Sequence, residues 1–93
     1  MKRTPKNILR HEIIGLRARI VESSNPYQVG IEGVIIDETM RTILFETERG
    51  KKRVLKDQVK LLIWLPSGTR IIVEGKELVG RPEDRLKKKL RFW

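Results

Sequence analysis

The feature that most constrains the fold of this chain is a pattern in its centre, where short β-branched runs alternate with turn residues. Ile and Val together number eighteen, and most of them lie between residues 20 and 79. Such runs favour strands, whereas the Gly, Pro, Asn and Asp residues between them favour tight turns. The centre of the chain is therefore predicted to be all β.

Six or seven short strands are predicted, bounded by the apolar runs and their turns: 16–23, 29–37, 42–47, 52–56, 59–65, 69–73 and a short seventh at 77–79. Gly30 and Gly33 both fall in the second run, and two glycines in one strand indicate a strand that curls. One flat sheet would leave an apolar face uncovered. A small, strongly bent antiparallel barrel covers that face and hides most strand edges, so we expect a single barrel domain over residues 1–93.

A short helix is predicted on each side of the barrel, at about 4–14 and 82–91. Thr4-Pro5 and Pro82 are typical of helix starts, because proline suits the first helical position. Each helix has an apolar stripe at helical spacing. We expect the two stripes to pack beside each other and to help bind a protein partner. The residues concerned are Leu9, Ile13, Leu86 and Leu90.

Most of the net charge of +9 lies at the two ends of the chain. Residues 1–15 hold four basic residues against one acidic residue, and residues 81–93 hold six against two, whereas 16–80 contribute only +2. This distribution makes nucleic acid the first partner to consider. A membrane is not expected, because no segment is apolar enough to span one and neither end has a broad apolar face.

The expected RNA contacts are basic side chains of the two ends and of a hairpin around Gly50. That hairpin is surrounded by Arg49, Lys51, Lys52, Arg53 and Lys56. Aromatic residues are few, and Phe45 and Trp64 lie in apolar runs where core positions are expected. Stacking on single strands is therefore disfavoured, and recognition of folded RNA through its backbone and shape is favoured. The predicted RNA-binding residues are Lys6, Arg10, Lys51, Lys52, Arg81, Arg85, Lys87, Lys88, Lys89 and Arg91.

No catalytic arrangement is apparent in the sequence. His11 is the only histidine and cysteine is absent, which excludes a thiolate metal site and a disulfide framework. The acidic pairs Asp37-Glu38 and Glu83-Asp84 are explained by turn chemistry and by helix-dipole placement. We therefore assign no catalytic residue, no metal and no cofactor to the chain. Residues 1–10 lack the apolar run of a secretory signal, so a cytoplasmic protein is expected.

Four segments resemble archaeal ribonuclease P protein component 1, in order and over nearly the whole chain. They are NILRHEIIGL at 7–16, GIEGVIIDETMRTILFET at 30–47, LPSG at 65–68 and GRPEDRLKKKLR at 80–91. The resemblance implies an Sm-like, SH3-type barrel with flanking helices. It implies a non-catalytic subunit of the ribonucleoprotein that removes 5′ leaders from precursor tRNA. It also implies that Mg²⁺ acts on the RNA of the holoenzyme, and that the chain binds this RNA and the zinc-ribbon protein subunit.

Two alternatives stay open on the residues alone. One is a ribosomal or translation-factor barrel of SH3 type, and the other is an Sm-like scaffold that forms homomeric rings around RNA. Size-exclusion chromatography would detect ring formation as an apparent mass several times that of one chain. The identity of copurified RNA would separate a ribosomal protein from a ribonuclease P subunit.

Overall fold

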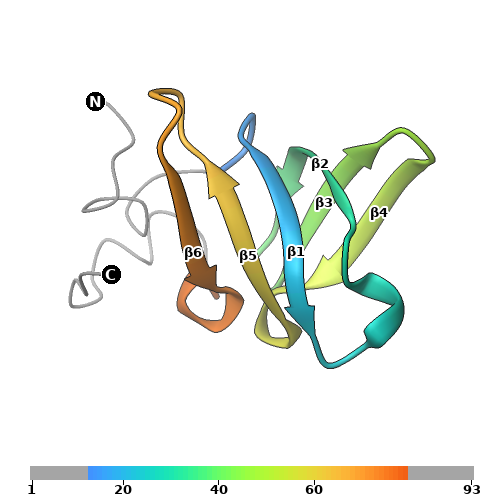
Figure 1. Ribbon diagram of the computed structural model, residues 1–93. Helices are drawn as coiled ribbons and strands as arrows, with labels where there is room; N and C mark the ends of the chain where they lie inside the picture. Colours follow the sequence, from blue (N-terminus) through green and yellow to red (C-terminus); the bar gives the residue numbers. More distant parts are fainter. Residues whose placement is uncertain (1–12, 80–93) are drawn as a thin grey trace.

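Six antiparallel strands and three short 3₁₀ helices make up the computed structural model, which describes residues 13–79 (Figure 1). The strands form one sheet in the order β4-β3-β2-β1-β5-β6. The elements are β1 Arg17–Ser23, η2 Pro26–Gln28, β2 Glu32–Glu38, β3 Thr42–Thr47, β4 Gly50–Leu55, η3 Lys56–Gln58, β5 Val59–Trp64, β6 Arg70–Glu74 and η4 Gly75–Leu78. The prediction of a mainly β fold with six or seven short strands is confirmed, with six strands formed.

Two details of the predicted strands are wrong. The segment expected as a seventh strand holds the helical turn η4, and this turn places the side chain of Leu78 in the core with no exposed surface. The second strand begins at Glu32 and not at Val29, because Gly30 adopts a φ of 92° in the turn that follows η2. Gly30 therefore lies in that turn, before β2 begins.

The sheet is strongly bent, as the sequence predicted. The registers of β1 with β5 and of β2 with β3 both shift by a residue within the strands, and such bulges increase the local twist. At Gly33 the bend brings β3 so close that a Cβ atom would lie 2.1 Å from the backbone oxygen of Glu46. Within residues 13–79 the edge strands β4 and β6 each pair with one neighbour, so the sheet is open.

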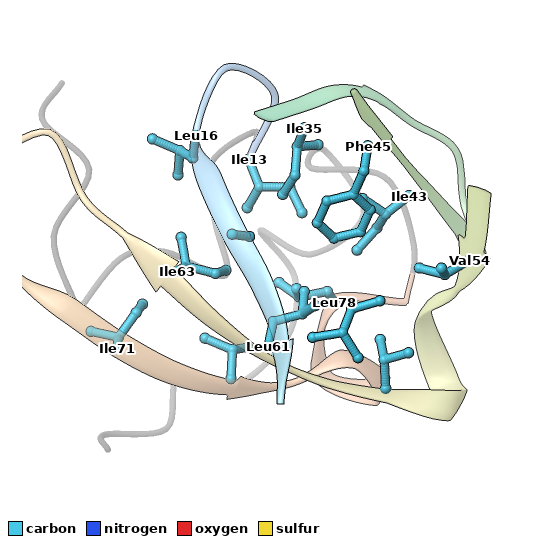
Figure 2. Packing of buried hydrophobic residues seen from close by; sticks show 14 of the residues in the cluster. Ile13, Leu16, Ile35, Ile43, Phe45, Val54, Leu61, Ile63, Ile71 and Leu78 are labelled. Carbon is cyan, nitrogen blue, oxygen red and sulfur yellow. The ribbon is translucent and has the colours of Figure 1, made fainter. Parts of the chain in front are cut away.

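The core fills the inner face of the bent sheet (Figure 2). Alternate residues of the strands point inward, which is the period-2 pattern of a half-buried strand. Phe45 is fully buried, as predicted, whereas Trp64 is only partly buried and lies outside the core cluster. The core residues are Ile13, Leu16, Ala18, Ile20, Ile35, Ile43, Phe45, Val54, Val59, Leu61, Ile63, Leu65, Ile71, Val73 and Leu78.

Ile13 belongs to this core, although the sequence suggested a role in binding a protein partner. Its side chain has no exposed surface, and Figure 2 shows it beside Ile35. Ile13 and Ile14 lead into β1 through a turn at Gly15, whose backbone N–H donates to the carbonyl of Ile35 over 2.7 Å. These residues are not helical. The side chain of Ile13 therefore packs within the chain, and its placement does not support a docking role.

A buried ion pair connects several parts of the fold. Lys56 has no exposed surface, and its Nζ donates to Glu38 Oε2 over 2.7 Å, to the carbonyl of Leu78 over 2.8 Å and to that of Met40 over 3.3 Å. The Glu38 side chain is only 1% exposed. These bonds join η3, the end of β2, the turn that follows it, and η4. The assignment of Lys56 to the exposed charges around the Gly50 hairpin was wrong, because the chain turns inward after β4.

Candidate nucleic-acid interface

The hairpin of β3 and β4 is held rigidly at its tip. Thr47 pairs with Gly50, and Gly50 has a φ of 104°, a conformation that glycine adopts without steric cost. The hydroxyl of Thr47 accepts a hydrogen bond from the backbone N–H of Arg49 over 3.1 Å. The same hydroxyl donates to the carbonyl of Gly50 over 2.7 Å. A tip with these bonds presents the basic residues around it in a defined arrangement.

Three consecutive basic residues, Lys51, Lys52 and Arg53, lie on β4, which is an edge strand. All three are exposed. Residues that face each other across two strands lie on one face of the sheet. Lys52 lies opposite the core residue Phe45, and Lys51 lies opposite Glu46. The two lysines therefore extend from opposite faces of the same edge.

A groove with a volume of about 770 Å³ runs between the β3–β4 hairpin and the segment of η2 with the residues after it. In Figure 1 both of these segments lie on the right, with η2 in the teal connection between β1 and β2. Five of the charged residues that line the groove are basic and two are acidic. They are Arg17, Arg49, Lys51, Lys52 and Arg53, together with Glu32 and Glu48.

The basic residues of the groove differ in whether a protein group already binds them. Arg17 donates to Glu32 Oε2 from Nε over 3.0 Å and from Nη2 over 2.5 Å. Arg53 donates to the Thr42 hydroxyl over 2.8 Å and lies 3.8 Å from the Asp37 carboxylate. The side chains of the remaining cations form no ion pair and no hydrogen bond with another residue of the range 13–79. These available cations are Arg49, Lys51 and Lys52.

The structure places two of the ten predicted RNA-binding residues, Lys51 and Lys52, in this groove. The other predicted contacts lie outside the described residues and stay predictions: Lys6, Arg10, Arg81, Arg85, Lys87, Lys88, Lys89 and Arg91. Leu9, Leu86 and Leu90 of the predicted partner surface also lie outside them, as do His11, Glu83 and Asp84.

The sequence suggested that the Asp37-Glu38 pair lies in a turn. In the structure the pair forms the end of β2 instead. Asp37 lies near Arg53, and Glu38 accepts a hydrogen bond from Lys56. Basic side chains thus already face both carboxylates. Among residues 13–79 no group of three or more potential ligands gathers for a metal ion, and no helix is long and apolar enough to cross a membrane.

A second charged cluster, on β1, β5 and β6, holds two carboxylates and one lysine. Lys60 Nζ lies 2.8 Å from a carboxylate oxygen of Glu22 and 3.2 Å from one of Glu74. The hydrogen bonds to Glu22 and Glu74 raise the pKa of Lys60 above its ordinary value of 10.5. Because two glutamates surround this lysine, the cluster should attract a polyanion less strongly than the groove does.

Sequence reasoning missed the position of Tyr27, which is 92% exposed and lines the groove. A signal for it exists in the residues that precede it. Asn25 is a strong capping residue and Pro26 a favoured first helical residue, so Asn-Pro-Tyr predicts a turn with an aromatic residue at its tip. The groove therefore combines an exposed ring with three available cations.

Comparison with known proteins places the chain in a family. Residues 6–88 match the family model for "Ribonuclease P/MRP, subunit p29". Ribonuclease P protein component 1 of Thermofilum pendens is 57% identical, with complete coverage of both chains. The protein of the same name from Methanocaldococcus jannaschii is 44% identical over 96% of this chain and 94% of its own length.

The structure of Mth11, described as a homologue of human RNase P protein Rpp29, has the same fold. The TM-score is 0.59 and the sequence identity 37%, over 81% of this chain and 97% of Mth11. The family model, the relatives and this structure agree with one another. The chain belongs to the ribonuclease P/MRP p29 family, as a relative of the archaeal ribonuclease P protein component 1.

Proposed function

We propose that this chain is a non-catalytic subunit of ribonuclease P that binds the catalytic RNA of the holoenzyme through phosphates. Family membership makes it a ribonuclease P subunit. The observation that supports RNA binding is the groove, where Arg49, Lys51 and Lys52 are exposed and available. Mg²⁺ bound to the RNA supplies the chemistry of 5′-leader removal in this proposal, and the protein positions the RNA.

Electrostatics supports phosphates as the main contact of the hairpin. Lysine is a point charge on a flexible stem, and it neutralises a phosphate without reading a base. Each neutralised phosphate releases condensed counterions, so affinity falls as salt rises. The two lysines extend from opposite faces of an edge strand, which lets them reach phosphates on two sides of the hairpin. This arrangement suits a folded RNA whose backbone passes around β4.

The predicted terminal helices complete the proposal. Their basic residues are expected to add phosphate contacts. Their apolar residues Leu9, Leu86 and Leu90 are expected to help bind the zinc-ribbon subunit of the same enzyme. Precursor tRNA reaches the protein only through this complex. We place the complex in the cytoplasm.

The salt dependence of binding to ribonuclease P RNA tests the role of the hairpin. The slope of log K against log salt is about −0.7 per phosphate contact for single strands and about −0.9 for B-DNA. The variant Lys51→Ala/Lys52→Ala should therefore bind more weakly, with a slope flattened by about 1.4 to 1.8. The matched control Arg70→Ala/Lys76→Ala removes the same charge from exposed positions outside the groove. It should retain the slope of the unmodified chain.

An unchanged slope in the hairpin variant would remove the groove from the proposal. The variant Lys87→Ala/Lys88→Ala/Lys89→Ala then decides whether the C-terminal lysines hold the RNA instead. Purified, RNA-free chain should not cleave precursor tRNA in the presence of Mg²⁺. Specific 5′ cleavage that follows the protein through purification would contradict the non-catalytic role.

A further inference from the structure

We propose that the groove between the η2 segment and the β3–β4 hairpin binds an unpaired nucleotide, with the base stacked on Tyr27. In this proposal Arg49 and Lys52 contact the phosphates that flank the base. The inference rests on the proposed RNA-binding function and narrows it, because it assigns a single-stranded segment of RNA to this groove.

The exposure of Tyr27 is the first observation. Tyr27 is 92% exposed, whereas the next most exposed large apolar residue of the described chain, Val29, is 50% exposed. Transfer of an apolar aromatic ring out of water is favourable. The fold does not cover the Tyr27 ring, so a ligand that covers it would be stabilised by this burial.

The second observation is that Tyr27 is presented on a rigid turn. The side-chain oxygen of Asn25 accepts a hydrogen bond from the backbone N–H of Tyr27 over 3.0 Å, and Pro26 restricts the backbone at the first position of η2. The Ser23 hydroxyl donates to the Gln28 side chain over 2.8 Å and accepts from the backbone N–H of Asn25 over 3.0 Å. A turn ordered before binding loses less entropy when the ligand binds.

The third observation is the chemistry that surrounds the ring. The same groove is lined by Arg49, Lys51 and Lys52, which have no ionic partner within residues 13–79. An aromatic platform beside cations that follow a backbone is the arrangement that binds single-stranded nucleic acid. In a duplex the faces of internal bases are covered by their neighbours, so the ring would find nothing to stack on.

A nucleic acid fits this groove better than a protein partner does. The cores of protein interfaces are depleted in charged residues. Here the charged residues of the hairpin and of β1 and β2 line the groove together with Tyr27. The sparse aromatic residues of the chain still favour backbone recognition for most of the RNA. Tyr27 adds one local contact to an unpaired base.

Binding of the full chain to two RNAs tests the inference: an unstructured single strand of eight nucleotides and a long duplex that holds the same sequence in its interior, where the base faces are covered. Stacking contributes enough that Tyr27→Ala should weaken single-strand binding roughly 5- to 150-fold. Tyr27→Trp should retain the affinity, and neither variant should change duplex binding. Lys52→Ala should weaken binding of both RNAs and flatten the salt slope. Because the Tyr27 ring is exposed, the two Tyr27 variants should fold normally.

Single-strand affinity that is unchanged in Tyr27→Ala would overturn the inference. If the unmodified chain still binds ribonuclease P RNA in that case, the proposed function stands without the role for Tyr27. Loss of affinity for the zinc-ribbon subunit in Tyr27→Ala, with RNA binding intact, would show that the groove binds protein and would also overturn it. Failure of the unmodified chain to bind any of these RNAs would reject the proposed function together with the inference.

Discussion

Replacement of Lys56 by methionine should severely destabilise the fold. Methionine keeps the length and the apolar stem of lysine but removes the ammonium group that bonds to Glu38, Met40 and Leu78. The Glu38 carboxylate, which is 1% exposed, then stays buried without its lysine. Removal of one partner from a buried ion pair costs about 3–5 kcal/mol, because the remaining charge is poorly solvated.

This loss is a large fraction of the total stability expected for a small domain, which is about 5–15 kcal/mol. In a domain of this size each kcal/mol lowers the Tm by about 4–8 °C. The midpoint of thermal unfolding should therefore fall by at least about 12 °C. Guanidinium chloride unfolding of the full chain, followed by circular dichroism, measures the free energy directly.

Two further variants make this experiment decisive. Lys76→Met makes the same substitution at an exposed position of η4 and should change the free energy of unfolding by less than about 0.5 kcal/mol. Glu38→Leu/Lys56→Met removes both buried charges and should recover much of the stability lost in the single variant. A loss below about 1 kcal/mol in Lys56→Met, or a double variant no more stable than the single one, would refute the reasoning.

Three other predictions concern the bend of the sheet, a charged cluster and the partner surface. Gly33→Ala should cost about 1–3 kcal/mol or more in guanidinium unfolding, because its Cβ would lie 2.1 Å from the Glu46 oxygen; a change below about 0.5 kcal/mol would show that the strands separate easily. The hydrogen bond to Glu22 raises the pKa of Lys60 above 10.5, so its contribution to stability is complete below pH 10.5 and is lost as pH rises through the higher folded value. Lys60→Met should therefore make the unfolding midpoint less sensitive to alkaline pH, and identical pH profiles would contradict this. Leu90→Asp should weaken binding to the zinc-ribbon subunit with the β sheet still folded, which calorimetry and circular dichroism can check together.

The regular strands could be predicted from the sequence because alternation along each strand is a local signal. The bounds of β3 were predicted without error, since Ile43 and Phe45 alternate with less buried residues between two clear turns. The 3₁₀ turn η4 has no periodic signal of its own, and the apolar pair Leu78-Val79 at its end led to the prediction of a strand over 77–79. Only the structure identifies this turn, because there the turn places Leu78 in the core.

The candidate site could be predicted only where one local signal sufficed. Lys51 and Lys52 were predicted because a glycine turn marks the hairpin. Lys56 was misplaced because its partner Glu38 lies eighteen residues earlier, and a lysine considered by itself is expected at the surface. The groove joins Tyr27 to a hairpin some twenty residues further along the chain, and only the bend of the sheet brings the two segments to one groove.

Sequencing of the RNA that copurifies with the chain tests the proposed function most directly. The chain carries an affinity tag and is purified at moderate salt from cells of its own or a closely related organism. We predict that ribonuclease P RNA is strongly enriched over total RNA, and that Lys51→Ala/Lys52→Ala reduces this enrichment. Enrichment of ribosomal RNA instead, or recovery of RNA in proportion to its cellular abundance, would contradict the proposal that the chain binds the ribonuclease P RNA.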